Sequence, residues 1–61
     1  MKSDYMVEHV FKDGRVQYAV SRLKDINMPD KADNREYFGI YEDYNTAYFT
    51  AANLNIEAGM S

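Results

Sequence analysis

Residues 5–22 alternate between apolar and polar side chains on both sides of an Asp13-Gly14 pair. Alternation with a period of two is typical of strands that bury one face. Asp-Gly favours a two-residue hairpin turn, because both central residues of that turn need a positive φ. The pattern therefore predicts a hairpin in which Phe11 faces Val16. One face of it carries the larger apolar and aromatic residues: Tyr5, Val7, His9, Phe11, Val16, Tyr18 and Val20. A three-residue loop would shift the pairing and mix the two faces.

The chain between residues 24 and 35 has the composition of a loop. It is rich in Asn and Asp, and Pro29 is incompatible with a central strand because it lacks a backbone N–H. Residues 36–41 predict a third strand, in which Gly39 marks either a bulge or a point where the helix comes close. On this strand we expect Tyr37 and Tyr41 on one face, and Phe38 and Ile40 on the other.

Residues 44–58 predict a helix. Asp43, or Glu42 beside it, is suited to cap the free N–H groups at its start, and Gly59 is typical of the position just after a helix end. At about 100° per residue, one contiguous apolar face gathers Tyr44, Ala47, Tyr48, Ala51, Leu54 and Ala58. We expect the small alanines of this face to lie against the sheet.

A second apolar stripe lies beside the first one and contains Phe49, Ala52 and Ile56. Glu57 is the only charged residue of the segment, whereas a surface helix normally has a charged outer face. Three short strands can cover one stripe but not both. The second stripe, together with Tyr48, therefore predicts an interface formed by Tyr48, Phe49, Ala52 and Ile56. The alternative is a rotated helix, with Phe49 and Ile56 in the core and the alanines outside.

The order of these elements predicts an α+β fold, in which a three-stranded antiparallel sheet packs on one C-terminal helix (βββα). Residues 1–61 form a single small domain. A chain of this length buries only about 60% of the surface it exposes when unfolded, so its core alone supplies little stability. The absence of cysteine excludes disulfides and thiolate metal sites. Oligomerisation is the remaining way to stabilise so small a core, and we expect a homodimer.

Catalytic and cofactor motifs are absent from the sequence. It has no Gly-rich phosphate loop, no metal-ligand spacing and no nucleophile motif, so we expect a non-enzyme without cofactor or metal. His9 lies on the apolar hairpin face and is expected to be a core or interface histidine. Four loop residues resemble calcium ligands but lack the glycine and the closing Glu of a calcium loop: Asp25, Asn27, Asp30 and Asp33.

Targeting signals are also absent. No apolar stretch approaches the roughly 20 residues of a membrane span, and the first residues do not have the pattern of a signal peptide. We expect a cytoplasmic protein without a membrane partner. Met1 suggests a complete small open reading frame, of the kind that phages and mobile elements encode. A small non-catalytic interaction or regulatory protein that self-associates through its C-terminal helix fits these observations.

The net charge of −3 and the pI of about 4.8 argue against a general nucleic-acid binder. Basic residues nevertheless concentrate in residues 1–24 and acidic residues in the remainder. Two alternatives follow from this asymmetry. A nucleic-acid-binding module would use the outer face of the hairpin through Lys12, Arg15, Gln17 and Lys24. An acidic decoy would engage a basic protein surface through the carboxylates between Asp25 and Glu36 and through Asp43.

The segment Phe38-Gly39-Ile40-Tyr41-Glu42-Asp43, followed by Ala47 and Ala51, resembles the strand-to-helix junction of AP2-type domains and phage-integrase arm-binding domains. The resemblance implies a three-stranded antiparallel sheet packed on one helix, whose outer face enters the major groove of DNA through Arg, Lys and Trp. This chain has no Trp, and Glu8 interrupts the outer face of its hairpin. The resemblance therefore supports the topology.

Overall fold

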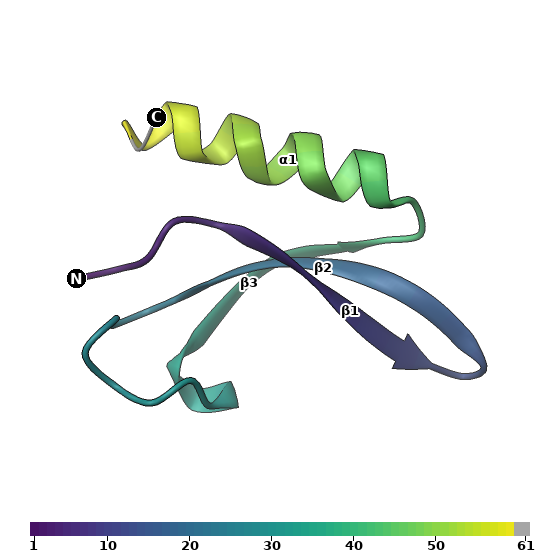
Figure 1. Ribbon diagram of the computed structural model, residues 1–61, viewed down its shortest axis with the longest axis horizontal. Helices are drawn as coiled ribbons and strands as arrows, with labels where there is room; N and C mark the ends of the chain where they lie inside the picture. Colours follow the sequence, from purple (N-terminus) through teal and green to yellow (C-terminus); the bar gives the residue numbers. More distant parts are fainter. Residues whose placement is uncertain (60–61) are drawn as a thin grey trace.

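The computed structural model describes residues 1–59 and has one helix lying across one face of a three-stranded sheet (Figure 1). The strand order is β1-β2-β3, and both neighbouring pairs are antiparallel. The predicted βββα arrangement is confirmed. The elements are β1 (Met6–Lys12), β2 (Arg15–Leu23), the short 3₁₀ helix η1 (Ala32–Asn34), β3 (Arg35–Tyr41) and α1 (Tyr44–Glu57).

The hairpin between β1 and β2 has the predicted turn and register. Asp13 and Gly14 have φ angles of 53° and 77°, as a two-residue turn with two left-handed positions requires. Phe11 pairs with Val16, and the register continues without interruption to the start of β1. The hairpin tip projects beyond the N-terminal end of α1 (Figure 1). Phe11 consequently stays 75% exposed, although it lies on the face that α1 covers farther along.

A bulge interrupts the pairing between β2 and β3. Val20 pairs with Gly39. The next residue of β2, Ser21, pairs with Tyr37, which leaves Phe38 as an extra residue in β3. A Cβ atom at Gly39 would lie 2.8 Å from the hydroxyl oxygen of Tyr41. Of the two roles expected for Gly39 the bulge is confirmed, and its close neighbour is a tyrosine of its own strand rather than the helix.

This bulge overturns the predicted faces of β3. Val20 packs against α1, so its neighbours Ala19 and Ser21 lie on the outer face of the sheet, which is turned away from the helix. Tyr37 and Ile40 lie opposite Ser21 and Ala19 and therefore lie on this outer face as well. Phe38 lies on the helix side instead, where its ring meets that of Tyr5 at 6.4 Å. The prediction that Tyr37 shares a face with Tyr41 was wrong, because strict alternation fails where one strand contains an extra residue.

The helix begins and ends where the sequence predicts, within one residue. Asp43 caps it, because its carboxylate accepts a hydrogen bond from the backbone N–H of Thr46 at 3.0 Å. Gly59 follows the last turn with a φ of 75°, a conformation that glycine adopts without the strain a Cβ would cause. Ala47 and Ala51 are buried against the sheet. The rotated helix, with its alanines outside, is therefore wrong.

The buried core is small. Between the sheet and α1 its buried apolar members are Val20, Ala47 and Ala51. Ala19 is buried on the outer face of the sheet, and so is Ser21, the only buried polar residue among residues 1–59. Tyrosines and other side chains at the margin pack around this centre: Tyr5, Val7, Tyr18, Tyr41 and Leu54. No helix within residues 1–59 has the length and apolar character that a bilayer crossing requires.

Candidate protein interface

The outward side of α1 is apolar and exposed. Phe49 and Ile56 are 62% and 63% accessible, and Tyr48 is half-exposed. Ala52, the fourth residue of the predicted interface, lies beside them with intermediate exposure. Both large side chains of the second stripe thus point away from the sheet. The structure brings the four predicted residues together on one side of the helix.

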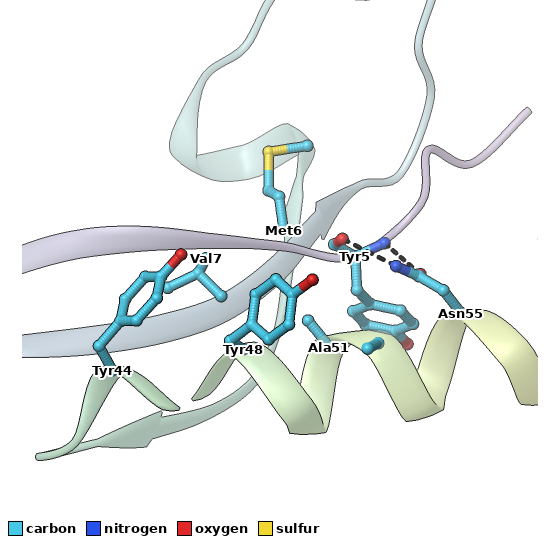
Figure 2. A pocket seen from close by; sticks show the side chains of 8 residues that line it. Tyr5, Met6, Val7, Tyr44, Tyr48, Ala51 and Asn55 are labelled. Atoms are coloured by element: carbon cyan, nitrogen blue, oxygen red, sulfur yellow. Dashed lines mark hydrogen bonds between the residues drawn. The ribbon is translucent and has the colours of Figure 1, made fainter. Parts of the chain in front are cut away.

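A groove runs between β1 and α1 on the same side of the molecule (Figure 2). Its volume is about 330 Å³, and none of its lining residues is charged: Tyr5, Met6, Val7, Tyr44, Tyr48, Ala51, Ala52 and Asn55. Tyr44 and Tyr48 extend from the helix toward β1, while Met6 turns to the opposite side of the strand. The groove therefore joins the edge of the sheet to the exposed apolar side of the helix.

A chain of aromatic contacts crosses from the sheet to the outer side of the helix. The rings of Tyr18 and Tyr44 lie 5.5 Å apart, and Tyr44 stacks on Tyr48 at 6.2 Å. Tyr48 in turn meets Phe49 edge to face at 5.6 Å. His9 begins this chain beside Tyr18 at 5.4 Å, and it is exposed rather than in the core. Tyrosines in such an array present large, rigid and amphipathic surfaces, which are enriched at protein interfaces.

Asn55 binds the backbone of Tyr5, just before β1 (Figure 2). Its Oδ1 accepts from the Tyr5 N–H at 2.7 Å, and its Nδ2 donates to the Tyr5 carbonyl at 3.1 Å. The side-chain amide thus takes the place that a neighbouring strand would occupy. Sequence reasoning missed this residue. The available signal was a lone Asn within the apolar face of the helical wheel, between Tyr44 and Tyr48.

The predicted nucleic-acid contacts do not form a single basic patch. Arg15 and Gln17 both donate to the Glu42 carboxylate, at 3.3 and 3.2 Å. Lys12 lies opposite Arg15 beside the turn, whereas Lys24 follows the far end of β2. Glu42 therefore offsets part of the positive charge at the hairpin tip, where the two neighbouring cations lie.

Three of the carboxylates expected in an acidic decoy, Asp25, Asp30 and Glu36, have partners within the chain. Asp30 binds Arg35 through both carboxylate oxygens, at 2.6 Å each. Hydrogen bonds from Arg22 and Lys2 hold the pKa of Glu36 below its ordinary value. The backbone N–H of Asn27 and the N-terminal amino group likewise lower the pKa of Asp25. Within residues 1–59, no three His, Cys, Asp or Glu side chains lie close enough to hold a metal ion.

Arg35 is the centre of a polar network on the outer face of the sheet that the sequence did not reveal. Its side chain is only 8% exposed, and it donates to the Ser21 hydroxyl at 2.8 Å. Ser21 in turn contacts Glu8 at 3.5 Å. Burial, followed by the charge of Glu8, raises the pKa of the neighbouring Tyr37. Long side chains from the flanking strands thus cover the small residues of β2.

No protein-family model, curated protein or solved structure matches this chain. The resemblance of the β3–α1 junction to AP2-type and phage-integrase arm-binding domains stays a prediction.

Proposed function

We propose that the protein is a small non-catalytic interaction or regulatory protein that self-associates through α1. The contact would involve Tyr48, Phe49, Ala52 and Ile56. The observation that carries this proposal is the exposure of two large apolar side chains on a helix with a single charged residue. Contiguous exposed apolar surface is typical of interaction sites. We expect the protein to act in the cytoplasm.

The size of the core supports the proposal. Among residues 1–59, only Val20 of the larger apolar residues is fully buried. Single cores in domains below roughly 70 residues supply only a few kcal/mol. A standard interface buries about 800 Å² per partner, which is roughly a fifth of the 4381 Å² that this chain exposes. At about 25 cal/mol per Å² of apolar area, such a contact would rival the stability of the isolated chain.

Sedimentation equilibrium on the wild type and on a Phe49→Asp, Ile56→Asp double variant tests the proposal. We expect a wild-type dimer and a monomeric double variant, because a carboxylate buried at the contact loses its hydration without gaining a partner. A matched control adds two acids to the polar side of the same helix, as Thr46→Asp with Asn53→Asp, and should remain a dimer.

Circular dichroism of all three proteins separates loss of association from loss of fold. A monomeric double variant with the wild-type spectrum supports the proposal. A wild type that sediments as a monomer at about 100 μM, well above the micromolar Kd of modest interfaces, overturns it. A dimer that survives in the double variant would also overturn the assigned contact.

A further inference from the structure

We propose that two copies of the chain associate by pairing their β1 strands antiparallel about a two-fold axis at His9. Phe11 of each copy then enters the groove between β1 and α1 of the other. The inference rests on the proposed self-association and specifies its geometry. It adds the strand edge, the register and the inserted side chain.

The direction of the backbone groups shows that β1 is an open edge. The N–H and C=O of Tyr5 both point outward to Asn55. Backbone groups alternate in direction along an antiparallel strand, so those of Val7, His9 and Phe11 point outward as well. Among the described residues, none donates to or accepts from these outward-pointing groups of Val7, His9 and Phe11. A row of unpaired donors and acceptors with a spacing of two residues is complementary to another strand.

The other edge of the sheet does not offer the same row. The bulge at Phe38 interrupts β3, and bulges of this kind are a common way to block pairing at an edge. β1 has no bulge and pairs with β2 continuously from Met6 to Lys12. Of the two edges, β1 is therefore the one suited to accept a strand.

The length of β1 and the position of Asn55 select the register. His9 is the central residue of Met6–Lys12, so a pairing that uses the whole strand places His9 opposite His9 and Val7 opposite Phe11. Asn55 already occupies the backbone of Tyr5. In this register Tyr5 lies opposite Asp13 of the second copy, where the hairpin turn of that copy begins. Asn55 and the second β1 strand therefore do not compete for the backbone of Tyr5.

Registers shifted by two residues are less favourable. A shift in one direction places Glu8 opposite Glu8, and like charges directly across a ladder repel. It also requires the backbone of Tyr5, which Asn55 holds. A shift in the other direction leaves only the residues from Glu8 to Lys12 paired and moves Phe11 away from Val7. The central register has no like charges opposite each other on the outer face, where Glu8 faces Val10.

Phe11 has the position and chemistry of the occupant of the groove. In the central register it lies beside Val7 of the second copy, on the helix side, where Tyr48 and Ala52 complete the wall. The groove is open on one side and measures about 330 Å³, whereas a cavity of about 150 Å³ suffices to bind benzene. None of its lining residues is charged, so an apolar ring can enter without burying an unpaired charge.

Single-cysteine crosslinking tests the register, because the natural chain has no cysteine. Residues opposite each other in a hydrogen-bonded antiparallel pair have Cα atoms about 5.5 Å apart, within the range of a disulfide. We expect His9→Cys to form a covalent dimer under mild oxidation at least about tenfold faster than three controls. Glu8→Cys and Val10→Cys report the two shifted registers, and Ile40→Cys reports the β3 edge. A faster reaction at any control overturns the inference.

Sedimentation of Phe11→Ser tests the inserted side chain. We expect its dimer Kd to rise at least about tenfold, as for a buried aromatic anchor. Val16→Ser, an exposed neighbour at the same hairpin tip, should leave the Kd within about threefold of the wild type. Because Phe11 is exposed in the single chain, its variant should keep the wild-type circular dichroism spectrum. An unchanged Kd for Phe11→Ser overturns the insertion.

The outcomes separate this inference from the proposed function. A wild-type dimer that depends on Phe49 and Ile56 but ignores Phe11, with no preferred crosslink at His9, overturns strand pairing and leaves helix-mediated association standing. Fast crosslinking at His9 in a dimer that tolerates the Phe49→Asp, Ile56→Asp change supports strand pairing and overturns the role of the helix. A monomeric wild type overturns both.

Discussion

The two edge strands of the sheet, β1 and β3, differ in how far their polar groups have partners within the chain. On the β3 flank, the strand contains a bulge and its charged side chains have partners within the chain. Arg35 binds Asp30, and Glu36 accepts from Arg22 of β2 and from Lys2. On the β1 flank, the strand is regular and borders an uncharged groove beneath exposed tyrosines. Among the described residues, only Asn55 binds backbone groups on the open side of this flank, at Tyr5 just before β1.

This contrast shows how a small protein can separate folding from association. Charged side chains of the β3 flank have partners within the chain, so changes there should alter the free energy of unfolding. Large side chains of the β1 flank have unused surface, so changes there should alter association. Four predictions test the contrast, beginning with the largest expected effect on stability.

Arg35→Ala should lower the free energy of unfolding by about 2 kcal/mol. The substitution removes charge-assisted hydrogen bonds to Asp30 and Ser21 and uncovers part of the outer face. Thermal denaturation followed by circular dichroism should show a fall of roughly 10 °C in a domain of this size. Arg35→Lys keeps the charge but loses the paired contact with Asp30, so it should be intermediate. A loss below about 0.5 kcal/mol, as at ordinary surface sites, would show that the β3 flank is not closed by this network.

Asn55→Ala should cost about 1 kcal/mol, because it removes two hydrogen bonds to the Tyr5 backbone. Hydrogen exchange at the Tyr5 amide is the sharper measurement, since that amide donates to Asn55 and should exchange faster in the variant. Asn55→Asp keeps the acceptor and loses the donor, so the Tyr5 amide should stay protected. If the Tyr5 amide exchanges equally fast in the wild type and in Asn55→Ala, the cap contributes nothing to the edge.

Glu36→Gln should have a smaller, pH-dependent effect. The folded-state pKa of Glu36 lies below its ordinary value of 4.5 because Arg22 and Lys2 donate to it. Its stabilising contribution is therefore complete above pH 4.5 and is lost as the pH falls through the lowered pKa. The difference in melting temperature between wild type and variant should be constant from pH 7 to about pH 5 and shrink below about pH 4.5. Added salt should also reduce it at pH 7. A difference that is equal at pH 3 and pH 7 would contradict the ion pair.

Phe49→Ser should have the smallest effect on the fold. At concentrations where the chain is monomeric, we expect the free energy of unfolding to change by less than about 0.5 kcal/mol, because the side chain is already exposed. Val7→Ser provides the contrast, since Val7 packs against the core and its loss should be clearly destabilising. A destabilisation of the monomer by Phe49→Ser comparable to that of Val7→Ser would place Phe49 in the core and remove the distinction between the flanks.

The sequence by itself determined the features that depend on local chemistry. Asp13-Gly14 has the left-handed backbone that its turn requires, and this turn sets the register of the whole hairpin. Asp43 and Gly59 mark the helix ends through capping groups adjacent in sequence. The side of the helix that packs on the sheet could also be predicted, because a side lined by alanine allows close approach and Ala47 is fully buried. Each of these features depends on residues within one element or at one junction.

Only the tertiary structure decided the features that depend on elements distant in sequence. The bulge at Phe38 places Tyr37 on the face of the sheet opposite to the one that alternation predicts, because β3 keeps its pairing with β2 while it accommodates an extra residue. Asn55 lies fifty positions from Tyr5, and no periodic pattern connects them. The groove and the open edge likewise arise where α1 crosses β1 without covering it. Local preferences specify each element, whereas the surfaces left uncovered depend on how the elements pack.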